Sequence, residues 1–179
     1  FGIFSYVGVE QGINNWSSQF LYQYHSLDPE VVGVDVISAF WGNLTIGTII
    51  SLFLVKLIDE KKLLNIYALS SSIIVLLAIH GDSEISVLSF KLLGFSISGV
   101  WSVMISLGLN SVPKNHSVFT GILLTGIVGG AIFPFIVASI GQLFNLKVGM
   151  HFILIGLVYL FYVSFKAKPL ISNKTIKIN

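Results

Sequence analysis

Six long apolar runs follow one another along the chain and are separated by short polar loops. The runs cover about residues 1–22, 36–55, 63–79, 85–112, 118–143 and 148–165. About 20 apolar residues cross the hydrocarbon core of a bilayer, and tilt accommodates runs of other lengths. The pattern therefore predicts an all-α integral membrane protein with six transmembrane helices.

Composition supports this class and excludes others. Hydrophobic residues make up 54% of the chain and charged residues 10%, whereas soluble proteins carry about 25% charged residues. All the basic residues are lysine, so the bidentate phosphate contacts of arginine are missing and we expect no nucleic-acid partner. The chain has no cysteine, and His80, His116 and His151 are scattered along it. We therefore expect no metal and no cofactor.

The lysines alternate between the loops. They are concentrated after the second, fourth and sixth runs, at Lys56, Lys61, Lys62, Lys114, Lys166, Lys168, Lys174 and Lys177. The other loops carry only Lys147. The positive-inside rule places the lysine-rich loops and both ends of the chain in the cytoplasm. Lys91 lies within the fourth run, and we expect its ammonium group to extend toward the membrane interface.

The character of the runs repeats after the third. The first and fourth contain many polar residues, the second and fifth contain glycine, and the third and sixth are mainly aliphatic and aromatic. This order predicts two inverted three-helix repeats, each with one helix along a pathway, one at an interface and one toward lipid. Chance variation among the helices of a bundle is the alternative.

Glu10 is the most unusual residue of the first run. A charge at the bilayer centre costs about 2.5 to 3.5 kcal/mol, so the carboxyl should face the bundle interior or a wet cavity. Asn14 lies one turn further along the same face and Gln11 lies beside it. The three side chains are candidates for binding the hydroxyl groups of a substrate or a proton. The alternative is a protonated, structural Glu10 that bonds a neighbouring helix.

Two further residues are candidates for substrate contacts. Asn43 lies in the second run, where an amide also serves to hydrogen-bond neighbouring helices. Trp101 lies in the fourth run, and its ring could pack on an apolar face of a substrate while the indole N–H donates to a hydroxyl. Packing in the core is the alternative for Trp101.

Small residues and one proline mark candidate packing or hinge positions. They are Gly8, Gly12, Gly126, Gly129, Gly130 and Pro134. Two glycines four residues apart let helices approach closely. Pro134 removes a backbone donor and should kink the fifth helix. A role in packing alone is the alternative to a hinge.

Several motifs resemble the carboxy-terminal half of the fucose and glucose/galactose permeases. They are FSYVGVEQGI at 4–13, Trp16, FWG at 40–42, IG at 46–47, KKLL at 61–64 and IVGGAIFP at 127–134. Those permeases are sugar–proton symporters of the major facilitator superfamily. The resemblance ends near Lys168 and departs from the family pattern at Thr48, where an arginine is common.

The resemblance implies a fold and a function. Residues 1–168 would form one six-helix half of a twelve-helix transporter, and residues 169–179 a cytoplasmic tail. The expected function is proton-coupled uptake of a monosaccharide such as fucose, glucose or galactose by alternating access, across a bacterial inner membrane. The main proton-coupling acids belong to the amino-terminal half, which we expect to be missing because the chain begins at Phe1 within an apolar run.

Other functions remain as alternatives. A carrier of another small polar solute, or a polytopic membrane scaffold, would have similar helices. An enzyme is not expected, because the sequence has no His-Glu-x-x-His motif, no Gly-x-Ser-x-Gly motif and no pair of intramembrane aspartates.

Overall fold

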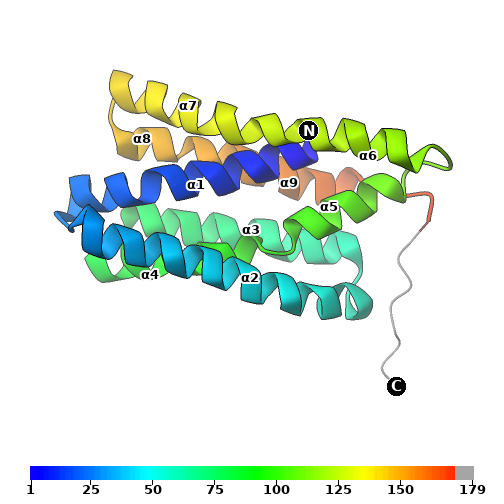
Figure 1. Cartoon of the computed structure of the whole chain (residues 1–179), viewed down its shortest axis with the longest axis horizontal. Coiled ribbons are helices and arrows are strands. Elements are labelled where there is room, and N and C mark those ends of the chain that lie inside the picture. Colours follow the sequence, from blue (N-terminus) through cyan, green and yellow to red (C-terminus); the bar gives the residue numbers. More distant parts are fainter. Residues whose placement is uncertain (172–179) are drawn as a thin grey trace.

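The computed structural model describes residues 1–171, which form a bundle of helices along one long axis (Figure 1). In chain order the elements are α1 (Gly2–His25), the π-helical turn η1 (Pro29–Gly33), α2 (Val34–Leu57), α3 (Glu60–His80), α4 (Ser83–Ile97), α5 (Val100–Leu109), α6 (His116–Leu124), the 3₁₀ turn η2 (Thr125–Val128), α7 (Gly129–Leu143), α8 (Leu146–Met150) and α9 (Phe152–Lys166). Short connections join antiparallel neighbours.

Five helical stretches in the described part of the chain are long and apolar enough to cross a bilayer. They are Pro29–Leu57, Glu60–His80, Ser83–Leu109, His116–Leu143 and Leu146–Lys166. They match the second to sixth predicted spans and confirm an all-α membrane fold. The 24-residue α1 is equally long but is not among them, since its amides and Glu10 reduce its hydropathy.

The second membrane helix begins earlier than the sequence pattern indicated. The Asp28 carboxylate accepts a hydrogen bond of 2.8 Å from the Glu30 N–H, and Pro29 occupies the first helical position. An acidic cap followed by proline is a strong helix start, since proline has no donor to leave unpaired. Asp35 consequently lies inside the helix, in the first turn of α2.

The fourth predicted span is interrupted between α4 and α5. At Gly99 a Cβ would overlap the Ser51 hydroxyl of α2 and the Tyr67 ring of α3. A larger residue at position 99 would therefore displace side chains of two neighbouring helices. The fifth span contains the 3₁₀ turn at Thr125–Val128, whereas Pro134 lies within α7, so the irregular turn precedes the glycine pair. The kink predicted at Pro134 stays a prediction.

The contacts that the helices of the first half of the chain make recur among the equivalent helices of the second half. The helix α1 packs against α7 and α9, while α4 packs against α2 and α3, and α3 also contacts α9. Exchanging α1 with α4, α2 with α7 and α3 with α9 reproduces the same set of contacts. This confirms the predicted pair of three-helix repeats, in the inverted arrangement that transporters use.

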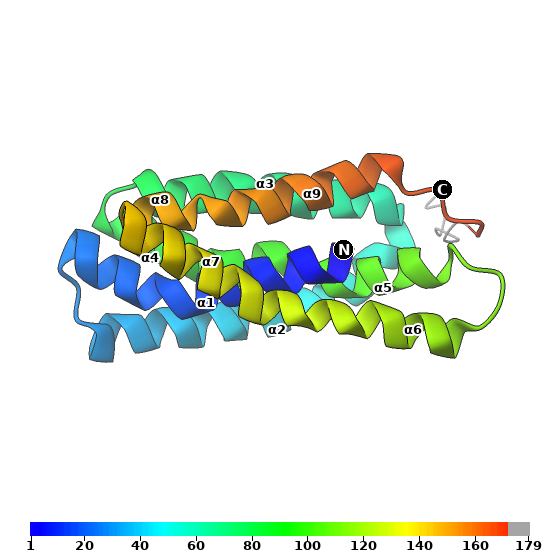
Figure 2. The same cartoon turned by 90° about the horizontal axis from the view of Figure 1, so that it is seen from above.

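The two faces of the bundle differ in burial. Figure 2 shows α3 and α9 along one side and α2 with α6 along the opposite side, with α1 and α5 between them. The most apolar 18-residue stretch is 22% buried in η1–α2 and 17% buried in α6–α7, against 56% in α4–α5. The second helix of each repeat is therefore the one whose apolar side chains are left uncovered.

Equivalent glycines bring the repeats together. A Cβ on Gly94 of α4 would meet the backbone carbonyl of Phe40 in α2, and a Cβ on Gly129 of α7 would meet the carbonyl of Phe4 in α1. Each contact joins the first helix of one repeat to the second helix of the other. Small residues at such crossings let membrane helices pack backbone to backbone.

The described part of the tail folds back on the bundle. The backbone N–H groups of Leu170 and Ile171 donate to the Asn110 carbonyl at the end of α5, at 2.8 and 3.3 Å. The predicted tail runs from 169 to 179, and residues 172–179 lie outside the described residues. The division of the chain at Lys168 stays a prediction.

Candidate functional site

Glu10 lies in the middle of α1, half-buried and surrounded by polar groups of its own helix. The Gln11 amide donates to the Glu10 carboxylate at 3.2 Å. The hydroxyl of Tyr6, one turn earlier, also interacts with this carboxylate, and the Tyr6 ring is almost fully buried. The Gln11 amide therefore helps to hold the carboxylate in place, and the carboxylate keeps further acceptor capacity.

Trp101 of α5 reaches the same place through Tyr6. The centroids of the two rings are 6.1 Å apart and the rings are tilted at 56°. The break between α4 and α5 sets the direction of α5 and brings its first turn against α1. The sequence indicated Glu10 and Trp101 separately. It gave no signal for Tyr6, which links them.

Asn14 also lies on this face, and its Oδ1 atom is buried. Among residues 1–171 this atom has no hydrogen-bond partner. Buried amide oxygens are nearly always paired, so an orphan acceptor calls for a partner outside the chain, such as water or a ligand hydroxyl. Glu10 and Asn14 thus lie one turn apart on α1 with Gln11 beside them, and their role in binding stays a prediction.

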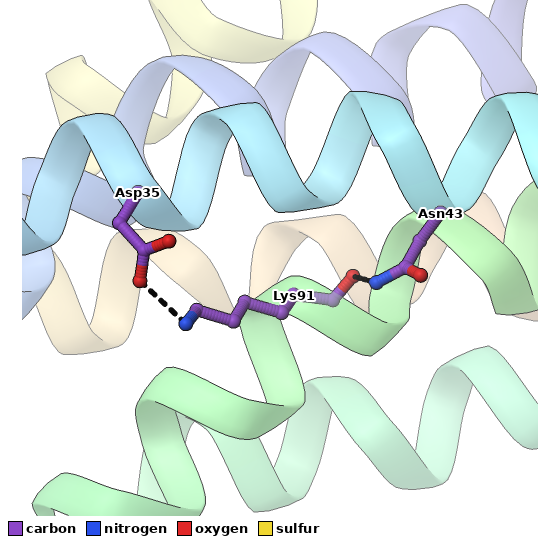
Figure 3. A network of polar contacts seen from close by, with 3 residues as sticks. All are labelled: Asp35, Asn43 and Lys91. Atoms are coloured by element: carbon purple, nitrogen blue, oxygen red, sulfur yellow. Dashed lines mark hydrogen bonds and ion pairs between the residues drawn. The ribbon is translucent and has the colours of Figure 1, made fainter.

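Asn43 belongs to a different cluster. Its amide donates to the Lys91 carbonyl of α4 at 2.9 Å, which favours the role of joining helices. Figure 3 shows the Lys91 side chain extended along α2 toward Asp35, and the ammonium lies 2.5 Å from the Asp35 carboxylate. Lys91 thus extends toward the first turn of α2, where its ammonium group pairs with Asp35, and its position at the membrane interface stays a prediction. Asp35 was missed because the apolar run was taken to begin at Val36.

The packing of the predicted glycines is close. A Cβ on Gly8 would overlap the Phe133 ring, on Gly12 it would lie 3.4 Å from Ile153, and on Gly126 it would lie 2.8 Å from the Phe4 nitrogen. On Gly130 it would lie 3.0 Å from Gln11 and Val7.

One hydrogen bond joins the predicted hinge region to α1. The Trp16 indole N–H donates to the Pro134 carbonyl at 3.0 Å. The α1–α7 contact is therefore close and polar at this point. Whether it also acts as a hinge stays a prediction.

A buried acid, Glu60, was not among the residues that the sequence indicated. It is the first residue of α3 and is 4% exposed. The Ser106 hydroxyl of α5 donates to its carboxylate, and the Asn110 amide donates to Ser106 at 3.3 Å. Ser106 therefore ties the start of α3 to the end of α5.

The histidines are less scattered than the sequence indicated. The Nε2 atoms of His80 and His151 are 3.0 Å apart, and His151 Nδ1 lies 2.7 Å from the Lys147 carbonyl. Two ligands do not complete a usual protein metal site. In the described part of the chain no group of three or more histidine, aspartate or glutamate side chains could hold a metal ion.

Comparison with known proteins identifies relatives of this chain. The chain is 29% identical over 171 residues to a protein named glucose/galactose transporter from Brucella abortus biovar 1 (strain 9-941), and to the protein of the same name from Brucella abortus (strain 2308). Each alignment covers 92% of this chain and 39% of the relative. The chain thus spans about two fifths of the length of these relatives. No family model matches the chain.

The fold also occurs in a solved transporter. The crystal structure of the peptide transporter POT in complex with alafosfalin superposes with a TM-score of 0.76 at 18% identity, over 92% of this chain and 36% of that chain. These proteins are named as transporters and not as enzymes, in agreement with the expectation that this chain is not an enzyme. This chain is accordingly an integral membrane protein that is similar to proteins named glucose/galactose transporter and that shares its all-helical fold with part of a solved peptide transporter.

Proposed function

We propose that this chain forms one half of a secondary transporter that takes up a monosaccharide, such as fucose, glucose or galactose, together with a proton by alternating access. The observation that carries the proposal is the similarity to glucose/galactose transporters over 92% of the chain, combined with unpaired polar groups at the middle of α1. Residues 1–168 act as the transporter half, and the tail begins at 169.

The cluster on α1 has the chemistry of a sugar site. Glu10 and Asn14 offer acceptors, Gln11 offers both donors and acceptors, and Trp101 offers a flat aromatic surface beside them. Intramembrane polar groups are costly unless they face a wet cavity or a partner. A monosaccharide presents hydroxyl donors around apolar C–H faces, which matches these groups. Glu10 binds sugar hydroxyls in this proposal, and the acids that bind the proton lie in the other half.

The uncovered face of the bundle fits a second six-helix half. The second helices of the two repeats, η1–α2 and α6–α7, expose most of their apolar side chains and flank α1 and α5 in the view of Figure 1. A partner of similar size would cover them and would leave the polar face of α1 at the junction, where inverted-repeat transporters bind substrate. The greater length of the relatives supports this partner.

The orientation follows from the lysines. The lysine-rich ends, which include the tail, lie in the cytoplasm of a bacterial cell, and the chain resides in the inner membrane. Reporter fusions test this. A reporter after Asp59 or Lys168 should report cytoplasm, and one after His25 or Asp82 the opposite side. Reversed signals at two sites would contradict this topology.

Uptake into proteoliposomes tests the function. The full-length transporter is reconstituted and offered fucose, glucose, galactose and a non-sugar solute of similar size, with and without an imposed proton gradient. We expect accumulation of at least one monosaccharide only with the gradient. Uptake of the non-sugar alone would favour a carrier of another polar solute, and no uptake of any solute would favour a scaffold.

A further inference from the structure

A cavity of about 630 Å³ lies between α1, α7 and α8, near the end of α1 that the lysine pattern places outside the cell. Its polar lining includes the amides of Asn15, Gln19 and Gln23 on α1 and of Gln142 and Asn145 on the opposite wall. Among the described residues, no side chain that lines it carries a charge. The volume falls within the range of small-molecule sites, which is about 300 to 1,000 Å³.

The amides of α1 follow a regular spacing. Gln11, Asn15, Gln19 and Gln23 are four residues apart, so each lies near the next on successive turns. The series spans about 18 Å at 1.5 Å per residue. It begins at the Glu10 carboxylate, which accepts from Gln11, and it ends in the cavity. A polar strip therefore connects the cavity with the candidate sugar site.

Three of the amides in the cavity are free. Within residues 1–171 the side chains of Gln19, Gln23 and Gln142 make no hydrogen bond, and all three are exposed. An unpaired amide is costly in hydrocarbon. These side chains must therefore face water or a polar ligand, and each can donate and accept.

Two walls of the cavity are fixed in position. The Trp16 indole N–H donates to the Pro134 carbonyl, and this bond holds the ring in place as an apolar wall of the cavity. The Tyr24 hydroxyl accepts from the Lys147 N–H at 3.0 Å, and the Asn145 oxygen accepts from the Val148 N–H at 2.9 Å. The first of these bonds joins α1 to the start of α8, and the second caps α8. Rigid aromatic walls together with free amides suit a ligand that has both C–H faces and hydroxyls.

We infer that this cavity is an outer subsite for a neutral monosaccharide, which binds there on the external side before it reaches Glu10. The neutral amides hydrogen-bond the hydroxyls of the uncharged sugar, and Trp16 packs against the sugar ring. The absence of charged side chains from the described lining disfavours ionic solutes. This inference rests on the proposed sugar transport, because the ligand is the transported sugar itself.

Equilibrium dialysis of the detergent-solubilised full-length transporter with radiolabelled galactose, glucose or fucose tests the subsite. We expect two sites per transporter, with the subsite the weaker one. Gln19→Leu on α1 and Gln142→Leu on α7 should each weaken that same site, by about 3- to 10-fold for one or two lost hydrogen bonds, and the double variant should retain only the stronger site. Gln19→Asn, which keeps an amide, should restore part of the binding.

Controls separate the subsite from the central site and from misfolding. Glu10→Gln should weaken only the stronger site. Tyr22→Phe, at an exposed residue of α1 that does not line the cavity, should keep both. A single site in the wild type, or a second site that survives in the double variant, would overturn the inference while sugar uptake remained intact. No sugar binding and no uptake would overturn the proposed function as well.

Discussion

The first helices of the two repeats, α1 and α4–α5, occupy equivalent places in the bundle but use their polar residues differently. In α4 two buried serines bond within the protein: Ser86 donates to the Ala78 carbonyl at 2.7 Å, and Ser96 lies 3.0 Å from the Ser71 hydroxyl. In α1 the Asn14 oxygen and the Gln19 amide find no partner among residues 1–171.

This difference separates stability from function. A polar group that is paired inside the bundle stabilises helix packing, whereas an unpaired one must be satisfied by water or ligand. We therefore expect variants of α4 to lower thermal stability with little effect on substrate affinity. Variants of the polar face of α1 should lower substrate affinity with little effect on thermal stability.

Gly94→Leu should have the largest effect on stability. A Cβ at Gly94 would overlap the Phe40 carbonyl of α2, and backbone cannot move aside cheaply, so we expect a loss of about 3 kcal/mol or more. In the full-length protein the melting temperature should fall by about 6 °C or more. Gly42→Leu is the matched control, because no described atom lies within 4 Å of its Cβ position. Equal melting temperatures for the two variants would contradict the close approach of α2 and α4.

Ser96→Ala should have a moderate effect on stability. The change removes the bonds of Ser96 to the Leu93 carbonyl and to Ser71 and leaves the buried Ser71 hydroxyl unpaired, at a cost of about 1 to 2 kcal/mol. The melting temperature should fall by about 2 to 6 °C, while the KM for sugar stays at the wild-type value. A raised KM with normal stability would show that α4 contacts substrate and would remove the contrast with α1.

Asp35→Asn should have the smallest effect. The Asp35 and Lys91 side chains are 61% and 27% exposed, so water screens their attraction and the pair contributes about 0 to 1 kcal/mol. Thermal unfolding should shift by less than about 3 °C. Glu30→Gln provides a control at an exposed acid in the same region. A drop larger than that of Ser96→Ala would mean that the pair is much less hydrated than its exposure indicates.

The sequence predicted features that depend on local pattern. Apolar run length located the second to sixth spans, and the alternation of polar, glycine-containing and aliphatic runs indicated two repeats. Glu10 stood out because a carboxyl is costly in an apolar run. Trp101 was a candidate from its residue type, and its ring does lie beside the buried Tyr6.

Features that depend on contacts between distant segments were not predictable. Lys91 and Asp35 are 56 residues apart in sequence, and their pairing requires the packing of α4 on α2. The break at Gly99 depends on Ser51 and Tyr67 of two other helices. His80 and His151 meet because α3 and α9 are neighbours. One sequence taken by itself carries no signal for contacts between residues that lie far apart along the chain.

The most direct test of the central claim is sugar transport by Glu10→Gln in the full-length protein, with Glu84→Gln, at an exposed acid of α4, as the control. Glutamine keeps the shape but not the charge, and a hydrogen bond to a charged group contributes about 1.5 to 3 kcal/mol. We predict that KM rises about tenfold or more for both exchange and gradient-driven uptake, at normal expression and melting temperature. Loss of accumulation with intact exchange would assign Glu10 to the proton instead. Wild-type KM and accumulation would show that Glu10 is structural and would contradict the claim that the polar face of α1 binds substrate.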